Sequence, residues 1–145
     1  MKNLSNTELL ILLLNYLPGN EMSGRTRFQK MVFLLKEAGV NFKYNFISYL
    51  YGPYSASLQN DIDLLTKFGI FKEIKENITF NTFSGEKYKY ILTDKGKALV
   101  KKIEKENKDE IKKFKETIDK YKNLSTGILI LASKYILNKK ITETR

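Results

Sequence analysis

The sequence of 145 residues predicts an α+β fold that is mostly α. A short helix from Ser55, with one apolar face and a stop at Gly69, runs into a candidate β-hairpin. Apolar helices precede this segment and follow it. This order is typical of a winged helix-turn-helix, here with additional C-terminal helices. We expect residues 1–93 to form a winged-helix domain and residues 94–145 a helical extension. The extension would pack on that domain, as one structural unit, or form a dimer interface.

Composition excludes several kinds of site. The chain has no Cys and no His, so disulfides, the usual zinc ligand sets and Ser-His-Asp or Cys-His catalysis are excluded. The net charge of +10 favours an anionic partner such as nucleic acid or an acidic protein surface. Residues 93–145 carry 15 Lys/Arg against 8 Asp/Glu, and residues 1–92 carry 11 against 8. Because lysine is abundant throughout, the charge is compatible with nucleic-acid binding but does not establish it.

The first helix is predicted at about residues 6–17, with Ser5 and Glu8 in a capping box and Pro18 and Gly19 at its end. Its apolar run, residues 9–14, is far shorter than the roughly 20 residues of a membrane span and lacks a signal-peptide cleavage site. We therefore expect a cytoplasmic protein with no membrane partner.

The second helix is predicted to open within residues 23–30, where Thr26 and Gln29 have capping-box spacing, and to stop at Gly39. Its expected inward stripe is Phe28, Met31, Val32, Leu35 and Ala38. Alternation in residues 40–51 predicts an extended stretch, with one short strand at about residues 46–50. Gly52 and Pro53 then predict a stiff turn before the helix capped by Ser55. The inward stripe of that helix is Leu58, Ile62, Leu65 and Phe68, and Phe71 packs back on its last turn.

The wing is predicted from extended residues 70–75 and 78–83, a turn at Ser84 and Gly85, and a return strand at residues 87–92. Thr93 and Asp94 are placed to start a helix over about residues 94–122, whose apolar seam is interrupted at Asn107 and Glu110. Residues 125–137 are apolar nearly all round, which predicts burial against the rest of the chain or a second copy.

Three segments carry a family resemblance: GRTRFQKMVFLL at residues 24–35, YGPYS at residues 51–55, and Asp61, Ile62 and Leu65. Across roughly residues 7–75 they resemble the YwgA-like proteins of archaea and bacteria. They are more distantly similar to the Panacea (SocA-type) antitoxin domain, with its comparable Leu-Gln-Lys helix and Tyr-Gly-Pro turn. Both likenesses imply a winged-helix-like domain that sometimes serves as an antitoxin or adaptor. Residues 90–97 resemble the wing-to-helix passage of MarR and PadR regulators, which implies DNA binding and dimerisation through terminal helices.

Base-reading side chains are predicted near the start of the helix at Ser55, because a helix-turn-helix reads the major groove there. The exposed candidates are Ser55, Ser57, Gln59 and Asn60, whose amides and hydroxyls can pair with base edges. The alternative is a helix that only packs, since residues 55–69 have a net charge of −1, from Lys67 against two Asp.

Phosphate contacts are predicted at Lys87 and Lys89 on the wing and at Arg25, Arg27 and Lys30 near the start of the second helix. Lysines on a sheet edge can instead discourage edge-to-edge aggregation. The three cations of the helix can instead pair with Glu21, Glu37 or a backbone carbonyl.

The aromatic series Tyr44, Phe46, Tyr49, Tyr51 and Tyr54 could stack single-stranded bases, but core packing is favoured because alternation already assigns half of them inward. Asp61 and Asp63 point to different sides of a helix and are rejected as a catalytic pair. No glycine-rich phosphate loop is present. We therefore expect no enzyme activity, no metal and no cofactor.

Two hypotheses follow. The first is a winged-helix DNA-binding protein, a homodimeric transcriptional regulator whose partner is double-stranded DNA. The second is a protein-interaction module on the same scaffold, an antitoxin or adaptor with a protein partner such as a toxin.

Overall fold

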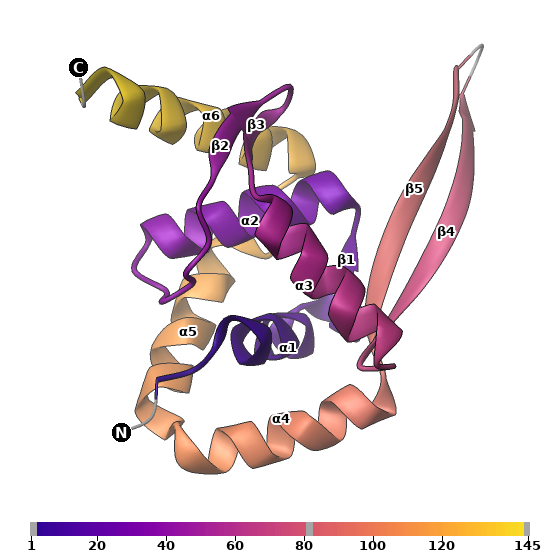
Figure 1. The fold of residues 1–145 in the computed structure, drawn as a ribbon, viewed down its shortest axis with the longest axis vertical. Helices are drawn as coiled ribbons and strands as arrows, with labels where there is room; N and C mark the ends of the chain where they lie inside the picture. The colour runs from indigo at the N-terminus through magenta and orange to yellow at the C-terminus, as the bar shows by residue number, and fades with distance from the viewer. Residues whose placement is uncertain (1–2, 81–82, 144–145) are drawn as a thin grey trace.

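The computed structural model describes residues 3–80 and 83–143, and in this part of the chain six α-helices and five strands form an α+β fold (Figure 1). The elements are α1 (Asn6–Tyr16), a 3₁₀ turn η1 (Pro18–Asn20), β1 (Glu21–Ser23), α2 (Arg25–Glu37), β2 (Ile47–Tyr49), β3 (Gly52–Tyr54), α3 (Ala56–Lys67), β4 (Phe71–Phe80), β5 (Phe83–Leu92), α4 (Asp94–Glu106), α5 (Lys108–Tyr121) and α6 (Thr126–Glu143).

The core is built around α1. Its six consecutive apolar residues, 9–14, are all buried because α3, α4, α5 and the strands β1 and β5 contact it from different sides. The predicted capping box is confirmed: the amide of Glu8 donates to Ser5 Oγ at 3.2 Å, and the amide of Ser5 donates to Glu8 Oε1 at 3.0 Å. Helix α2 is buried continuously from Phe28 to Leu35, so its core face is wider than the predicted stripe.

The larger sheet has the antiparallel order β1-β5-β4, and the β4–β5 hairpin extends away from the helices (Figure 1). Strand β1 was not predicted; it places Met22 opposite Tyr90. The predicted turn at Ser84 and Gly85 is wrong, because these residues pair with Thr79 and Ile78 inside one continuous hairpin. The connection between β4 and β5 falls at residues 81 and 82, outside the described residues.

A second, two-stranded sheet joins β2 and β3, with Ile47 opposite Tyr54. The prediction of a turn at Gly52 and Pro53 is therefore wrong: both residues lie in β3, and the hairpin turns at residues 50–51. Pro53 is tolerated because a strand at a sheet edge can lack one backbone donor.

The starts and stops of α2 and α3 follow the prediction in part. Gly39 and Gly69 end the helices with φ of 106° and 74°, as predicted. The capping box of Thr26 and Gln29 is wrong, since α2 already begins at Arg25, after Gly24, without a side-chain cap. Ala38 and Phe68, both predicted inward, are exposed because each is the last residue before its glycine stop.

The C-terminal helices also differ from the prediction. The single helix over residues 94–122 is interrupted at Asn107, whose buried side chain donates to the carbonyl of Ile103 at 3.0 Å. Helix α6 packs on α2 and β3 but buries only one face, so burial all round is not observed within the described chain. None of the described helices combines the length and apolar character that a membrane span requires.

Candidate functional site

The start of α3 is fixed to α2 by one side chain. Gln29 donates to the carbonyl of Ser55 at 2.9 Å and accepts from its amide at 2.8 Å. Ser55 is 1% exposed, and its hydroxyl accepts from the amide of Leu58 at 3.2 Å. Ser55 therefore caps α3 from inside the protein, and the predicted base readers that remain exposed are Ser57 and Asn60, with Gln59 half-buried.

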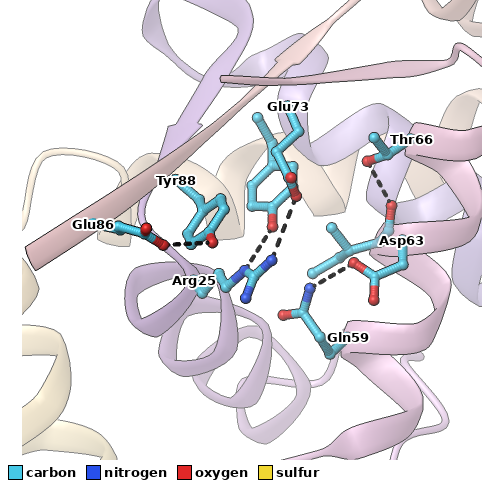
Figure 2. A network of polar contacts seen from close by, with 9 residues as sticks. Arg25, Gln59, Asp63, Thr66, Glu73, Glu86 and Tyr88 are labelled. Atoms are coloured by element: carbon cyan, nitrogen blue, oxygen red, sulfur yellow. Dashed lines mark hydrogen bonds and ion pairs between the residues drawn. The ribbon is translucent and has the colours of Figure 1, made fainter. Parts of the chain in front are cut away.

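Arg25 lies in a polar network between the start of α2, the β4–β5 hairpin and α3 (Figure 2). Its Nε donates to the hydroxyl of Tyr90 at 3.0 Å, and its Nη2 lies 3.6 Å from Glu73 Oε2. The guanidinium also stacks over the ring of Tyr88, at 3.8 Å from the centroid. Burial raises the pKa of Tyr90 to about 12, so its phenol stays neutral at physiological pH. The side chain of Arg25 is nevertheless 45% exposed and can contact a ligand.

Arg27 connects α2 to the α5–α6 junction. Its guanidinium donates to the carbonyls of Leu124 at 2.7 Å and Lys122 at 3.0 Å, and to the hydroxyl of Thr126 at 3.4 Å. Lys122 is the C-terminal cap of α5, so Arg27 satisfies a carbonyl that a helix end leaves without a partner. This is the carbonyl-binding alternative considered for the basic cluster.

Lys30 is 3% exposed, and its Nζ donates to the carbonyl of Pro53 at 2.8 Å. Burial, and secondarily the charge of Lys134, lower the pKa of Lys30 to about 8. No ion pair to a carboxylate is present for Lys30 within the described residues. A buried ammonium without a counter-ion is costly, which makes Lys30 an unusual group on this chain.

The two lysines predicted to lie on a wing differ in their contacts. Lys89 forms ion pairs with Glu21 at 3.3 Å and Glu76 at 3.5 Å, and its hydrogen bond to Glu21 raises its pKa. Lys87 is exposed and forms no ion pair among the residues that the structure describes. Of these two lysines, only Lys87 therefore presents a charge without an ion pair to the described residues.

Arg25, Arg27 and Lys87 come together along one groove of about 440 Å³ between the start of α2 and the β4–β5 hairpin, which we name the hairpin groove. Its lining is Ser23, Gly24, Arg25, Thr26, Arg27, Ile78, Glu86, Lys87, Tyr88 and Thr126. Because α2 starts here without a side-chain cap, its first amides also face this region.

A second pocket, of about 250 Å³, shares Arg25 and Thr26 with the hairpin groove and is named the tyrosine pocket. It is lined by Arg25, Thr26, Gln29, Lys30, Tyr49, Tyr51, Tyr54 and Gln59. The structure thus brings Arg25, Lys30 and Gln59 together, while Ser57, Asn60 and Lys89 line neither the hairpin groove nor this pocket.

The aromatic series is divided between core and surface. Tyr44 is buried and donates to Asp61 at 2.6 Å, and Phe46 is partly buried, as core packing predicts. Tyr49 and Tyr51 are each 60% exposed. Asp63 accepts from Gln59 at 2.9 Å, so Asp61 and Asp63 have separate partners. Across residues 3–80 and 83–143, no cluster of three or more His, Cys, Asp or Glu could hold a metal ion.

Sequence reasoning missed a set of exposed apolar side chains, which we name the apolar surface. It comprises Ile47, Tyr49, Leu50 and Tyr51 of the β2–β3 hairpin and Ile128, Leu131 and Tyr135 of α6. The all-round apolar pattern of α6 was the available signal, since a helix that packs on one side must expose the rest.

Comparison with known proteins gives one informative similarity. The chain is 30% identical over 113 residues to an uncharacterized protein of Bacillus subtilis named YwgA. The alignment covers 78% of this chain and 63% of that protein, so the chain spans less than two thirds of its relative's length. The similarity supports the predicted likeness to YwgA-like proteins. No family model matches the chain, and no solved structure matches it significantly.

Proposed function

We propose that the chain is a YwgA-like winged-helix protein that binds double-stranded DNA and acts as a transcriptional regulator. Two features support the scaffold. Helices α1, α2 and α3 precede the β4–β5 hairpin, with β1 between the first two helices, and β1 completes the sheet in the order β1-β5-β4. The hairpin projects beside α3 like a wing (Figure 1).

The observation that carries the proposal is the hairpin groove. Lys87 and the half-exposed Arg25 lie on it together with the uncapped start of α2. Cations and free helix amides in one place suit a phosphate, which both attract. A backbone phosphate in this groove would leave Ser57 and Asn60 on the exposed side of α3 to approach base edges.

We assign most of the DNA affinity to the hairpin groove rather than to α3, because the two differ in charge. Helix α3 carries Asp61 and Asp63 against Lys67, and its Gln59 is held by Asp63. A helix of this charge is a poor electrostatic partner for DNA, so binding should depend weakly on sequence and strongly on salt.

The test is a fluorescence anisotropy titration of labelled duplex DNA at two salt concentrations. We expect binding at low salt, and Lys87→Glu to weaken it by about tenfold while flattening the salt dependence. Lys105→Glu, the same charge change at an exposed residue of α4, is the matched control and should have a smaller effect. Equal losses in the two variants, or no binding of wild type at low salt, would refute the proposal.

A homodimer joined through the terminal helices remains part of the proposal. In a dimer, two exposed α3 helices about 34 Å apart would fit successive major grooves. Sedimentation equilibrium with and without duplex DNA tests it, and a monomer under both conditions would exclude it.

A second function, a protein-interaction module such as an antitoxin or adaptor, is favoured by a different observation. The apolar surface exposes seven large side chains on two elements that pack together. Apolar side chains gathered in this way are typical of protein interfaces.

A further inference from the structure

The apolar surface is built on two adjoining elements. Strand β3 packs against α6, and the Cγ of Lys134 lies only 3.0 Å from the position that a Cβ on Gly52 would occupy. Gly52 has a φ of 105°, so the hairpin approaches the helix where a larger residue would be both strained and obstructed. The exposed residues of the hairpin and of α6 are therefore held in a fixed relation.

The exposed side chains are large and uncovered. Leu50 and Leu131 are 74% and 70% exposed, and Tyr135 is 68% exposed. Residues 128, 131 and 135 lie on the side of α6 opposite its buried residues Leu129, Ser133 and Leu137. Tyr49 and Tyr51 belong both to this surface and to the wall of the tyrosine pocket, so the hairpin part of the surface adjoins the pocket.

The charge around this surface is mostly positive. Residues 38–60 contain no Asp or Glu, and residues 120–142 contain none. Lys134 and Lys139 are exposed on α6, and the buried ammonium of Lys30 lies beneath the hairpin against the carbonyl of Pro53. Glu37 of α2 lies 2.7 Å from Lys140 of α6, but the hairpin and residues 120–142 bring no carboxylate of their own. Cations therefore outnumber carboxylates around the apolar side chains.

We propose that the apolar surface binds an acidic, apolar segment of another protein. The inference rests on the second function above and names its partner's chemistry. Leucine-like or aromatic side chains of the segment would cover Tyr51, Leu131 and Tyr135. Tyrosine is one of the residue types that supply much of the energy of interfaces. Its carboxylates would face Lys134 and Lys139, and one carboxylate at the tyrosine pocket would approach Lys30.

A second copy of this chain is a poorer occupant of the same surface. In a two-fold interface the same patch faces itself, so Lys134 and Lys139 would oppose the same lysines of the partner. Each copy also carries a net charge of +10. Dimerisation through other faces is unaffected by this argument.

The experiment selects peptides from a random library displayed on phage, with the full chain as bait. A chain carrying Leu131→Ser and Tyr135→Ser removes peptides that bind elsewhere. We expect the enriched peptides to combine Asp or Glu with Leu, Phe or Trp. In anisotropy titrations of a labelled enriched peptide, Tyr51→Ser or Leu131→Ser should weaken binding by about tenfold or more. The double variant Lys134→Glu with Lys139→Glu should weaken it at least as much.

Matched controls are Leu64→Ser, an exposed apolar residue of α3 outside the surface, and Lys105→Glu on α4, which should both leave peptide affinity unchanged. Enriched peptides that are neutral or basic, or that bind the lysine variant normally, would overturn the acidic partner but leave the interaction module standing. No enrichment over the serine bait would overturn both. A homodimer that Leu131→Ser dissociates would assign the surface to a second copy instead.

Discussion

The hairpin groove and the apolar surface show opposite relations between side chains and the fold. In the groove, Arg25 and Arg27 already have partners in the chain, Tyr90 and Glu73 for the first and backbone carbonyls for the second. On the apolar surface, Leu131 and Tyr51 are mostly exposed, with little cover from the chain. The difference teaches that a basic cluster in the sequence can be structural, while an apolar helix can be the part left for a partner.

Of the two arginines in the groove, replacing Arg27 should have the larger effect on stability. Arg27→Met removes charge-assisted hydrogen bonds to the carbonyls of Lys122 and Leu124 and should lower the free energy of unfolding by about 2 kcal/mol. Urea denaturation monitored by circular dichroism measures the change.

Arg25→Met is the matched control, because Arg25 is more exposed and its pair with Glu73, at 3.6 Å, is long. Its loss should cost less than that of Arg27, at most about 1 kcal/mol. If the two substitutions cost the same, the two arginines would not differ in the way that the comparison requires.

Local sequence signals predicted some helix ends correctly, although the two predicted turns and the capping box of Thr26 and Gln29 were wrong. The capping box of Ser5 and Glu8 and the glycine stops at Gly39 and Gly69 involve residues a few positions apart, so the pattern contains all the partners. The break at Asn107 was visible only as an interruption of the seam.

Contacts between distant segments could not be predicted in the same way. Gln29 has capping-box spacing from Thr26, yet its amide binds the backbone of Ser55, 26 positions along the chain. Arg27 reaches Leu124, 97 positions away. One sequence does not show which carbonyl a cation will meet, so the division of the candidate site into structural and exposed cations required the fold.

Lys30 combines features of the two regions, since it is a cation like those of the hairpin groove but lies buried under the apolar surface. Its titration offers a pH-dependent test. Its pKa is about 8 in the folded chain and near its ordinary value of 10.5 when unfolded. Between these values the unfolded chain binds more protons, so this group makes the free energy of unfolding rise with pH through that interval. Lys30→Met should remove this contribution, and urea unfolding at pH 7.5, 8.5 and 9.5 measures the difference from wild type.

The measurements must stay below about pH 10. Burial raises the pKa of Tyr16 and Tyr44, so above that pH the unfolded chain loses tyrosine protons that the folded chain keeps. The free energy of unfolding then falls with pH instead of rising. Lys105→Met, at an exposed position, should keep the wild-type pH dependence. Parallel curves for wild type and Lys30→Met would mean that Lys30 is not desolvated in the folded chain.

The smallest effect is expected on the apolar surface. The single variants Leu131→Ser and Tyr135→Ser should each change the free energy of unfolding by no more than about 0.5 kcal/mol. Both side chains are already largely in water when the chain is folded. Leu129→Ser, one face away on the same helix and fully buried, should cost several times more, about 3 kcal/mol. Urea denaturation of the three variants compares them directly. A large loss from Leu131→Ser would show that the chain itself covers this side of α6 in solution, and the surface would then have no room for a partner.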